Sequence, residues 1–185
     1  MDIIANKEYH NLNTLSSAIY EHCIFSNCDF SRLNFTNYSF EECQFNQCKM
    51  DEVTLLQTGI KVVIFNHCSL LEMHFEDCNP LLWKAEFNEC NVAGSTFPNM
   101  DLSRSVFKHC SLNSCDFIKA NLSKAIVTNS DLKHALFDET DLRRCDLRGS
   151  YNLVIDPKHN RMKGAILSKS QLSGLLKEYD LEIEE

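Results

Sequence analysis

The sequence predicts an all-β solenoid whose coils each have four sides, and three observations support this prediction. Large apolar residues and small residues recur in a frame of five along most of the chain. The two stand two residues apart within each unit, and the other three positions are mostly polar. Only 5 Gly and 3 Pro occur among 185 residues, and a 44% hydrophobic content can supply a core for one domain.

The cysteines show the five-residue period most directly. Up to Cys78 their numbers share one remainder on division by five, and from Cys90 onward they share another remainder, shifted by two. The twelve phenylalanines repeat this pattern two residues after the cysteine position. With the Phe or Leu position as the centre of each unit, the frame covers residues 15–75 and 82–147, and Leu82 is the first centre after the shift.

Neither a helix nor an isolated strand explains this pattern, because their periods are 3.6 and 2.0 residues. A chain that turns a corner after each short extended stretch directs the large and the small residue of a unit inward. With four units per coil, residues of successive coils form inward columns. One column contains Phe25, Phe45, Phe65, Phe87, Phe107, Val127 and Leu147, and another contains Phe35, Leu55, Phe75, Phe97, Phe117 and Phe137.

The shift in the frame predicts a bulge in the middle of the solenoid. Both columns continue across it only if two residues between Phe75 and Leu82 loop out. We expect this bulge at residues 77–81, because Pro80 suits a kink or an edge where no ladder donor is needed.

Cysteine and histidine do not indicate a metal site. Cysteines of one column would stand about 4.8 Å apart from coil to coil, without tetrahedral closure, so we interpret them as small buried hydrophobes. His22, His67, His109 and His134 take the outward last position of their units and do not converge. Phosphate-loop, dinucleotide, nucleophile-elbow and zinc-protease motifs are absent from the sequence. The sequence therefore predicts a protein that is not an enzyme and uses no metal or other cofactor.

Outward apolar residues indicate a candidate contact region near the bulge. Leu56, Val62, Ile64 and Leu71 occupy outward positions, and the single tryptophan, Trp83, directly follows the bulge. A partner could bind there, or the N-terminal segment and the bulge itself could cover these side chains.

Charge is unevenly distributed along the chain. The net charge is −8; residues 1–80 contain four Lys or Arg against eleven Asp or Glu, and residues 81–150 contain nine of each. This balance disfavours nucleic acid or an anionic membrane as a direct partner. Glu21 should stack beneath Glu41, a like-charge contact that costs stability. The candidate partner-binding residues are Glu41, Glu42, Asp51, Glu52, Glu72, Glu76, Asp77 and Trp83.

Beyond Leu147 the five-residue frame ends. Ser170 is placed to cap a short helix with an apolar stripe, which can cover the last coil and also meet its copy in a second subunit. We therefore expect an N-terminal cap at 1–14, the repeat at 15–150, and a C-terminal cap and dimerisation module at 151–185. The predicted dimer interface consists of Leu172, Leu175, Leu176 and Tyr179.

Targeting signals are not evident in the sequence. The first ten residues, MDIIANKEYH, do not combine a basic segment with an apolar run, as a signal peptide would. The chain also has no run of ~18 apolar residues, the length needed to span a membrane. We expect a cytoplasmic location.

The sequence resembles the pentapeptide-repeat family over about residues 15–150. The family motif is a small residue, Asp or Asn, Leu or Phe, and two polar residues. The stretches CDFIKANLSKA (115–125) and SDLKHALFDETDLRRCDLRGS (130–150) match it closely. The resemblance implies a right-handed quadrilateral β-helix with four units in each coil.

Within that family, the layout is most similar to the branch that protects DNA gyrase, the quinolone-resistance (Qnr-type) and microcin-immunity proteins. The shared features are the length, the interrupted coil, the aromatic core and a C-terminal I-D-P…G-L-L…I module.

This resemblance implies a homodimeric rod that imitates duplex DNA, binds DNA gyrase or a related topoisomerase, and protects it from quinolones or a peptide toxin. DNA carries one charge per ~1.7 Å, so a coil of ~4.8 Å would need about three acidic charges for full imitation. The net charge of −8 therefore supports only partial mimicry. The alternative function is an interaction scaffold with no role at gyrase.

Overall fold

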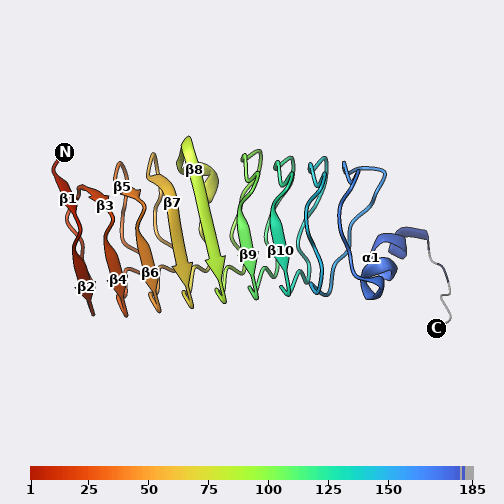
Figure 1. The fold of residues 1–185 in the computed structure, drawn as a ribbon, viewed down its shortest axis with the longest axis horizontal. Helices are drawn as coiled ribbons and strands as arrows, with labels where there is room; N and C mark the ends of the chain where they lie inside the picture. Colours follow the sequence, from red (N-terminus) through yellow and green to blue (C-terminus); the bar gives the residue numbers. More distant parts are fainter. Residues whose placement is uncertain (180, 182–185) are drawn as a thin grey trace.

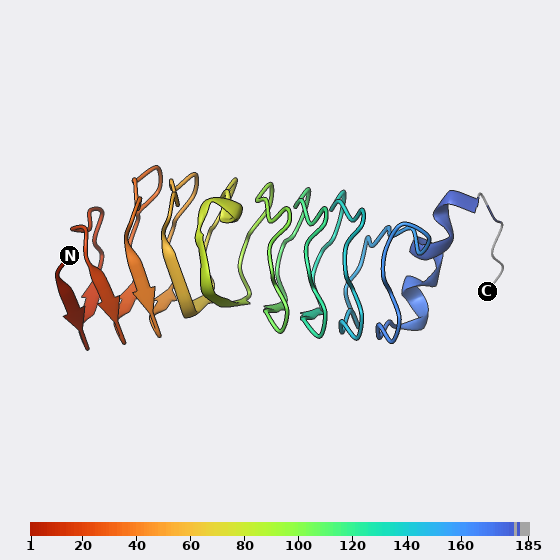
Figure 2. The same ribbon diagram turned by 90° about the horizontal axis from the view of Figure 1, so that it is seen from above.

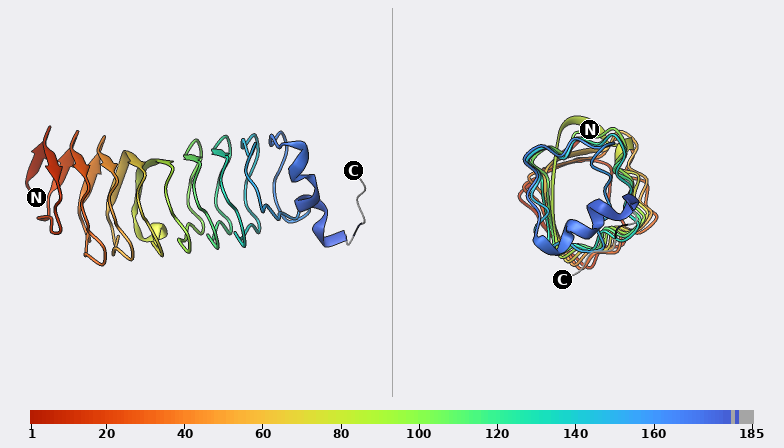
Figure 3. Two further views of the ribbon diagram at one scale, coloured as in Figure 1. Left: turned by 90° about the horizontal axis from the view of Figure 1, so that it is seen from below. Right: turned by 90° about the vertical axis from the view of Figure 1, so that its right-hand side faces the viewer.

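The computed structural model describes residues 1–179 and 181. The chain winds as a right-handed β-solenoid into an elongated rod, with the N-terminus at one end and helix α1 at the other (Figure 1). Viewed along the rod axis, the coils superimpose as a four-sided ring (Figure 3). The predicted fold class is confirmed.

Short strands of successive coils pair in parallel and form one continuous sheet. Partners lie 20 residues apart in the regular part, as Phe40 and Ile60 do, so four pentapeptides make one coil. The strands are β1 (Ile3–Ala5), β2 (Glu8–His10), β3 (Ile19–Glu21), β4 (Ile24–Ser26), β5 (Ser39–Glu41), β6 (Gln44–Asn46), β7 (Gly59–Asn66), β8 (Asn79–Asn88), β9 (Val106–Lys108) and β10 (Ile126–Thr128). The helical turns are η1 (Phe75–Asp77), η2 (Lys169–Gln171), α1 (Leu172–Leu176) and η3 (Lys177–Tyr179).

Four inward columns define the four sides of the rod, which we number in chain order. Aromatic rings stack along the columns, for example Phe87 on Phe107 with centroids 4.8 Å apart. The columns are Tyr20, Phe40, Ile60, Leu102, Leu122 and Leu142 on side 1; Phe25, Phe45, Phe65, Phe87, Phe107, Val127 and Leu147 on side 2; Phe30, Met50, Leu70, Val92, Leu112 and Leu132 on side 3; and Phe35, Leu55, Phe75, Phe97, Phe117 and Phe137 on side 4.

Most corners contain one residue in the left-handed backbone region. This residue is the second after a centre, as in Asn27 (φ 54°) and Lys124 (φ 62°). The conformation costs roughly 1–2 kcal/mol for most L-residues, and Asn tolerates it best. The side chain at such a corner points away from the core, so core packing does not restrict which residue stands there.

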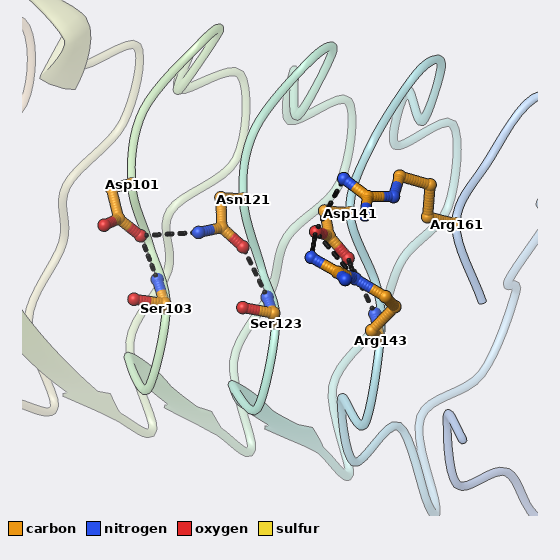
Figure 4. Close-up of polar contacts among 7 residues, drawn as sticks. All are labelled: Asp101, Ser103, Asn121, Ser123, Asp141, Arg143 and Arg161. Atoms are coloured by element: carbon orange, nitrogen blue, oxygen red, sulfur yellow. Dashed lines mark hydrogen bonds and ion pairs between the residues drawn. The ribbon is translucent and has the colours of Figure 1, made fainter. Parts of the chain in front are cut away.

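The acidic or amide residue before many centres has a local structural role. The Oδ1 atom of Asp101 accepts a hydrogen bond from the Ser103 N–H at 3.0 Å, and Asn121 accepts one from Ser123 at 3.0 Å (Figure 4). The side chain thus bridges its own centre residue. This contact explains why the motif prefers Asp or Asn at that position.

The interruption lies on side 1, a few residues later than predicted. Strand β8 pairs with β7 through Asn79 and again from Lys84, and the register shifts fall between these contacts. The assignment of Leu82 as an inward centre was wrong, because its side chain is 71% exposed. Trp83 packs against the core instead. Beyond the shift the columns continue as predicted, with Phe65 opposite Phe87.

At the N-terminal end, residues of the expected cap form part of a coil. Strand β1 pairs with β3 and β2 pairs with β4, so both lie at the edge of the sheet (Figure 1). The Tyr9 ring stacks on Phe25 with centroids 5.1 Å apart, whereas Ile3 is 63% exposed. The repeat pattern therefore extends into residues 1–14.

At the C-terminal end, the last coil continues beyond residue 150, and η2, α1 and η3 then cross the end of the rod (Figure 2). The helical segment begins after Ser168 rather than Ser170, because the Gln171 side chain accepts a hydrogen bond from the Ser168 N–H at 2.6 Å. Gln171 is buried, and its Nε2 donates to the carbonyl oxygens of Leu147 (2.7 Å) and Ser150 (2.8 Å). It thus satisfies carbonyl groups of the last coil.

Candidate interaction surfaces

The ten cysteines are buried and unpaired. Most of their thiols donate to backbone carbonyls, often of the preceding coil, as Cys43 Sγ does to the Tyr20 oxygen at 3.3 Å. Burial raises the pKa of Cys43 to about 12 and that of Cys110 to about 11. The interpretation of the cysteines as buried hydrophobes is confirmed. Within residues 1–179 and 181, no three His, Cys, Asp or Glu side chains are placed to hold a metal ion.

The histidines singled out by the sequence occupy corners, and each has a positive φ. His22 Nδ1 lies 3.4 Å from a Glu42 carboxylate oxygen, and His67 Nδ1 lies 3.4 Å from Glu89. These contacts join neighbouring coils at the surface. The described part of the chain also contains no helix long and apolar enough to cross a membrane.

Side 4 gathers four of the predicted acidic residues. Glu72, Glu76 and Asp77 belong to one coil, and Glu52 lies at the same corner as Glu72 in the preceding coil. Glu52, Glu72 and Asp77 line one shallow hollow. Glu52 is paired with Arg32 at 3.0 Å, and Glu76 accepts a hydrogen bond from the Thr96 hydroxyl.

The other three predicted acidic residues lie elsewhere. Glu41 and Glu42 belong to side 1 and its corner with side 2, and the Lys61 ammonium bound to Glu41 lowers the pKa of that carboxyl. Asp51 is on side 3, where it accepts hydrogen bonds from the Ser69 hydroxyl and the Leu71 N–H. These contacts hold Glu41 and Asp51 within the rod's own surface network.

The outward apolar residues divide into two groups. Leu56 and Val62 are 49% and 46% exposed, whereas Ile64 and Leu71 are half-buried. Trp83 is also half-buried and lies beside Cys78. The most exposed apolar side chains of this region were missed by the sequence analysis, since Leu82 was assigned inward and Leu81 to the bulge; they are 71% and 64% exposed.

The predicted dimer residues are on the helical segment that crosses the rod end. Leu175 packs against the core, so part of the stripe covers the last coil. Leu172, Leu176 and Tyr179 are 49%, 36% and 44% exposed. The Lys158 ammonium lies 4.9 Å from the centre of the Tyr179 ring.

A basic region in the second half of side 1 was not predicted. Asp141 binds both Arg143 and Arg161, and the Arg143 guanidinium lowers the pKa of Asp141 (Figure 4). At the corner with side 2, cations follow one another in successive coils. They are Arg104, Lys124 and Arg144. Reading every twentieth residue would have shown this column in the sequence.

A family model confirms what the coil geometry indicates. The model described as a pentapeptide repeat region matches residues 18–97 and 81–152. The chain belongs to the pentapeptide-repeat family. As in the family motif, its Asp and Asn residues bridge the centre of a unit, as Asp101 and Asn121 do.

Solved structures of pentapeptide-repeat proteins share the fold. Two trypsin-treated forms of QnrB1, a plasmid-mediated fluoroquinolone resistance protein, match with TM-scores of 0.51 and 0.50 at 19% and 18% identity, covering 99% of this chain and 98% of QnrB1. HetL, which is involved in heterocyst differentiation regulation in the cyanobacterium Nostoc sp. strain PCC 7120, has 15% identity and a TM-score of 0.32, covering 89% of this chain and 84% of HetL. A search of curated proteins finds no match.

Proposed function

We propose that this pentapeptide-repeat rod is a non-enzymatic binding protein whose side 4 docks on a basic, DNA-binding surface of DNA gyrase or a related topoisomerase. The main support is the coil that carries Glu72, Glu76 and Asp77. It places three carboxylates on one side of one coil, which is the density of about three charges per ~4.8 Å that duplex DNA presents. Glu52 adjoins this acidic patch in the preceding coil, where Arg32 balances its charge.

The extent of the patch limits the mimicry to a short stretch. Beyond the interruption, side 4 carries Asp116, Asp138 and Glu139, and Lys119 lies 3.7 Å from Glu139. The full-length similarity to a fluoroquinolone resistance protein adds weight to a topoisomerase as the partner. Binding would protect the enzyme from quinolones or a peptide toxin. Because such an enzyme acts on DNA, the proposal places this protein in the cytoplasm.

A supercoiling assay with purified gyrase and a fluoroquinolone tests the proposal. The wild-type rod should bind gyrase and restore supercoiling, and the double variant Glu72→Lys/Asp77→Lys should lose both effects. Glu86→Lys/Glu89→Lys on side 2 makes the same change in net charge and should behave like the wild type. Equal loss in both variants would point to net charge alone, and no effect of the wild type would refute the topoisomerase partner.

The second candidate is an interaction scaffold without a role at gyrase. The exposed Leu81 and Leu82 favour this function, because a soluble rod gains no stability from leucines directed into water. A wild-type protein that neither binds nor protects gyrase would support it.

We also propose that the protein is a homodimer through its C-terminal module. Leu172, Leu176 and Tyr179 remain exposed after Leu175 has packed on the core. A two-fold contact would bury these side chains on both chains and double the rod. Light scattering should show a dimer that Leu172→Ser/Leu176→Ser converts to a monomer, whereas Lys169→Ser should leave it intact. A monomeric wild type at micromolar concentration would refute this contact.

A further inference from the structure

An apolar projection stands on side 1 at the start of β8. Leu81 and Leu82 are its tip, and both are more than half exposed. The Leu81 N–H donates to Asn79 Oδ1 at 2.9 Å, Leu82 has a φ of 60°, and Trp83 anchors the base on the core. These contacts direct both leucine side chains away from the rod.

A hollow adjoins the projection on its N-terminal flank. Ile19, Ser39 and Gly59 contribute to it, with Tyr38 and Leu81 among the other lining residues. Gly59 lets the Ser39 side chain pack closely against the backbone, because a Cβ there would come within 2.5 Å of Ser39 Oγ. Ile19, Tyr38 and Leu81 supply apolar surface to the hollow, and its polar lining residues are Asn37, Ser39, Glu41, Gln57, Lys61 and Asn79.

The net charge changes sign along side 1 and its corner with side 2, with Lys61 bound to Glu41 on the acidic flank and Asp101 on the basic flank. Glu21 and Glu42 lie in coils on the N-terminal flank of the projection, whereas Lys84, Arg104 and Lys124 follow it. Within the part of the chain that the structure describes, these three cations form no ion pair. Arg104 and Lys124 stack about one coil apart, and both occupy the left-handed region. An isolated rod bears the repulsion between these stacked cations without a compensating contact.

We propose that side 1 binds a second copy of this chain through an antiparallel two-fold contact. A two-fold axis between the hollow and the projection brings the projection of each copy to the hollow of the other. The same operation places the acidic coils of Glu21 and Glu42 opposite the coils of Lys84, Arg104 and Lys124. Each contact then occurs twice, with apolar groups at the centre and complementary charges on both flanks.

Spacing favours a second copy over other partners. The charges on side 1 repeat once per coil of about 4.8 Å, and another rod of the same coil rise presents its charges at the same interval. A nucleic acid would meet the acidic coils as well as the basic ones, and it offers no pocket for two leucines. Side 4 and the C-terminal helix lie outside the contact, so this inference is independent of the proposed function.

Charge exchange between two full-length variants tests the contact. The acidic variant carries Arg104→Glu/Lys124→Glu, and the basic variant carries Glu21→Lys/Glu42→Lys. In a homo-dimer of either variant, like charges would face each other at both flanks. In the hetero-dimer, negative charges on one chain would face positive charges on the other. In native mass spectrometry of mass-tagged chains, we expect the hetero-dimer to exceed either homo-dimer by about tenfold or more.

Both variants also carry Leu172→Ser/Leu176→Ser, because an intact C-terminal contact would mix the chains statistically and mask this selectivity. Statistical mixing, or no association in the mixture, would overturn the proposal. Leu81→Ser/Leu82→Ser in both variants should weaken the selected hetero-dimer by about tenfold or more through loss of the apolar centre. An undiminished hetero-dimer after that change would overturn the assignment of the projection.

Discussion

At the C-terminal end of the rod, Gln171 closes the last coil by donating to two backbone carbonyls, and α1 lies across the opening. At the N-terminal end, β1 and β2 pair on one side only, and Ile3 and Met1 are exposed. The comparison separates two requirements of a solenoid. Buried polar groups of a terminal coil need partners, whereas an edge strand whose backbone faces water does not.

The largest expected effect comes from the middle of the rod, where both neighbouring coils are present. Phe65 stacks between Phe45 and Phe87, with centroids 5.2 and 5.1 Å away. Phe65→Ala should lower the free energy of unfolding by about 3–5 kcal/mol, because fixed coils leave a cavity. Tyr9→Ala at the open end should cost roughly 1–2 kcal/mol, since the ring is only half-buried. Equal costs in urea denaturation would show that the two regions do not differ.

The docking of α1 depends on a residue without a side chain. The Gly174 carbonyl accepts a hydrogen bond from the Ile155 N–H at 3.3 Å, and a Cβ at Gly174 would lie 1.8 Å from the Leu153 oxygen. Gly174→Ala should therefore displace the helix and lower the free energy of unfolding by roughly 2–4 kcal/mol. Ser173→Ala is the control, because Ser173 is exposed. Unchanged melting of the Gly174 variant would contradict the close approach.

Gln171 provides a test of the polar closure itself. Gln171→Leu keeps an apolar stem but leaves the Leu147 and Ser150 carbonyls without this donor. The free energy of unfolding should fall by about 1–3 kcal/mol. Amide exchange should accelerate in the last coil and remain unchanged around β3 and β4. Uniform acceleration along the rod would mean that the ends are coupled.

The smallest effect is expected at the open end. Ile3→Ser removes an apolar side chain that is already 63% exposed, so the free energy of unfolding should change by less than about 0.5 kcal/mol. Ile155→Ser at the closed end, where the side chain is 2% exposed, is the matched comparison and should cost several times more. Similar melting temperatures for the two variants would remove the distinction between the ends.

The five-residue frame predicted the columns because every inward position is decided by contact with the coils on either side. It failed at Leu82, because the extra residues of the interruption lie between Asn79 and Lys84. Leu82 is therefore exposed, and Trp83 packs against the core in its place. The helix start was misplaced at Ser170 because the Gln171 side chain accepts a hydrogen bond from the Ser168 N–H three residues earlier, which makes Ser168 the N-cap. That contact is a local capping box, and its Ser-x-x-Gln pattern at residues 168–171 is present in the sequence but was overlooked.

The candidate surfaces were predicted less well than the core. Glu72, Glu76 and Asp77 are close in the sequence and lie on one side, whereas Glu41 proved to be bound by Lys61, twenty residues away. The basic corner of Arg104 and Lys124 was overlooked because the charges of residues 81–150 balance when counted together. Counting the charges at each corner separately reveals the basic column.

The two ends also determine how the rod should respond to mechanical force. Each coil bonds only to its neighbours, and the bonds of β1 to β3 can open without disturbing β5. A load applied at residue 1 should therefore peel the rod coil by coil from the open end, giving a series of steps of similar length in an optical trap. A load applied at residue 179 must first release Gln171 and α1 from the last coil. Unfolding should therefore begin at a lower force when the rod is pulled from its N-terminal end than when it is pulled from its C-terminal end.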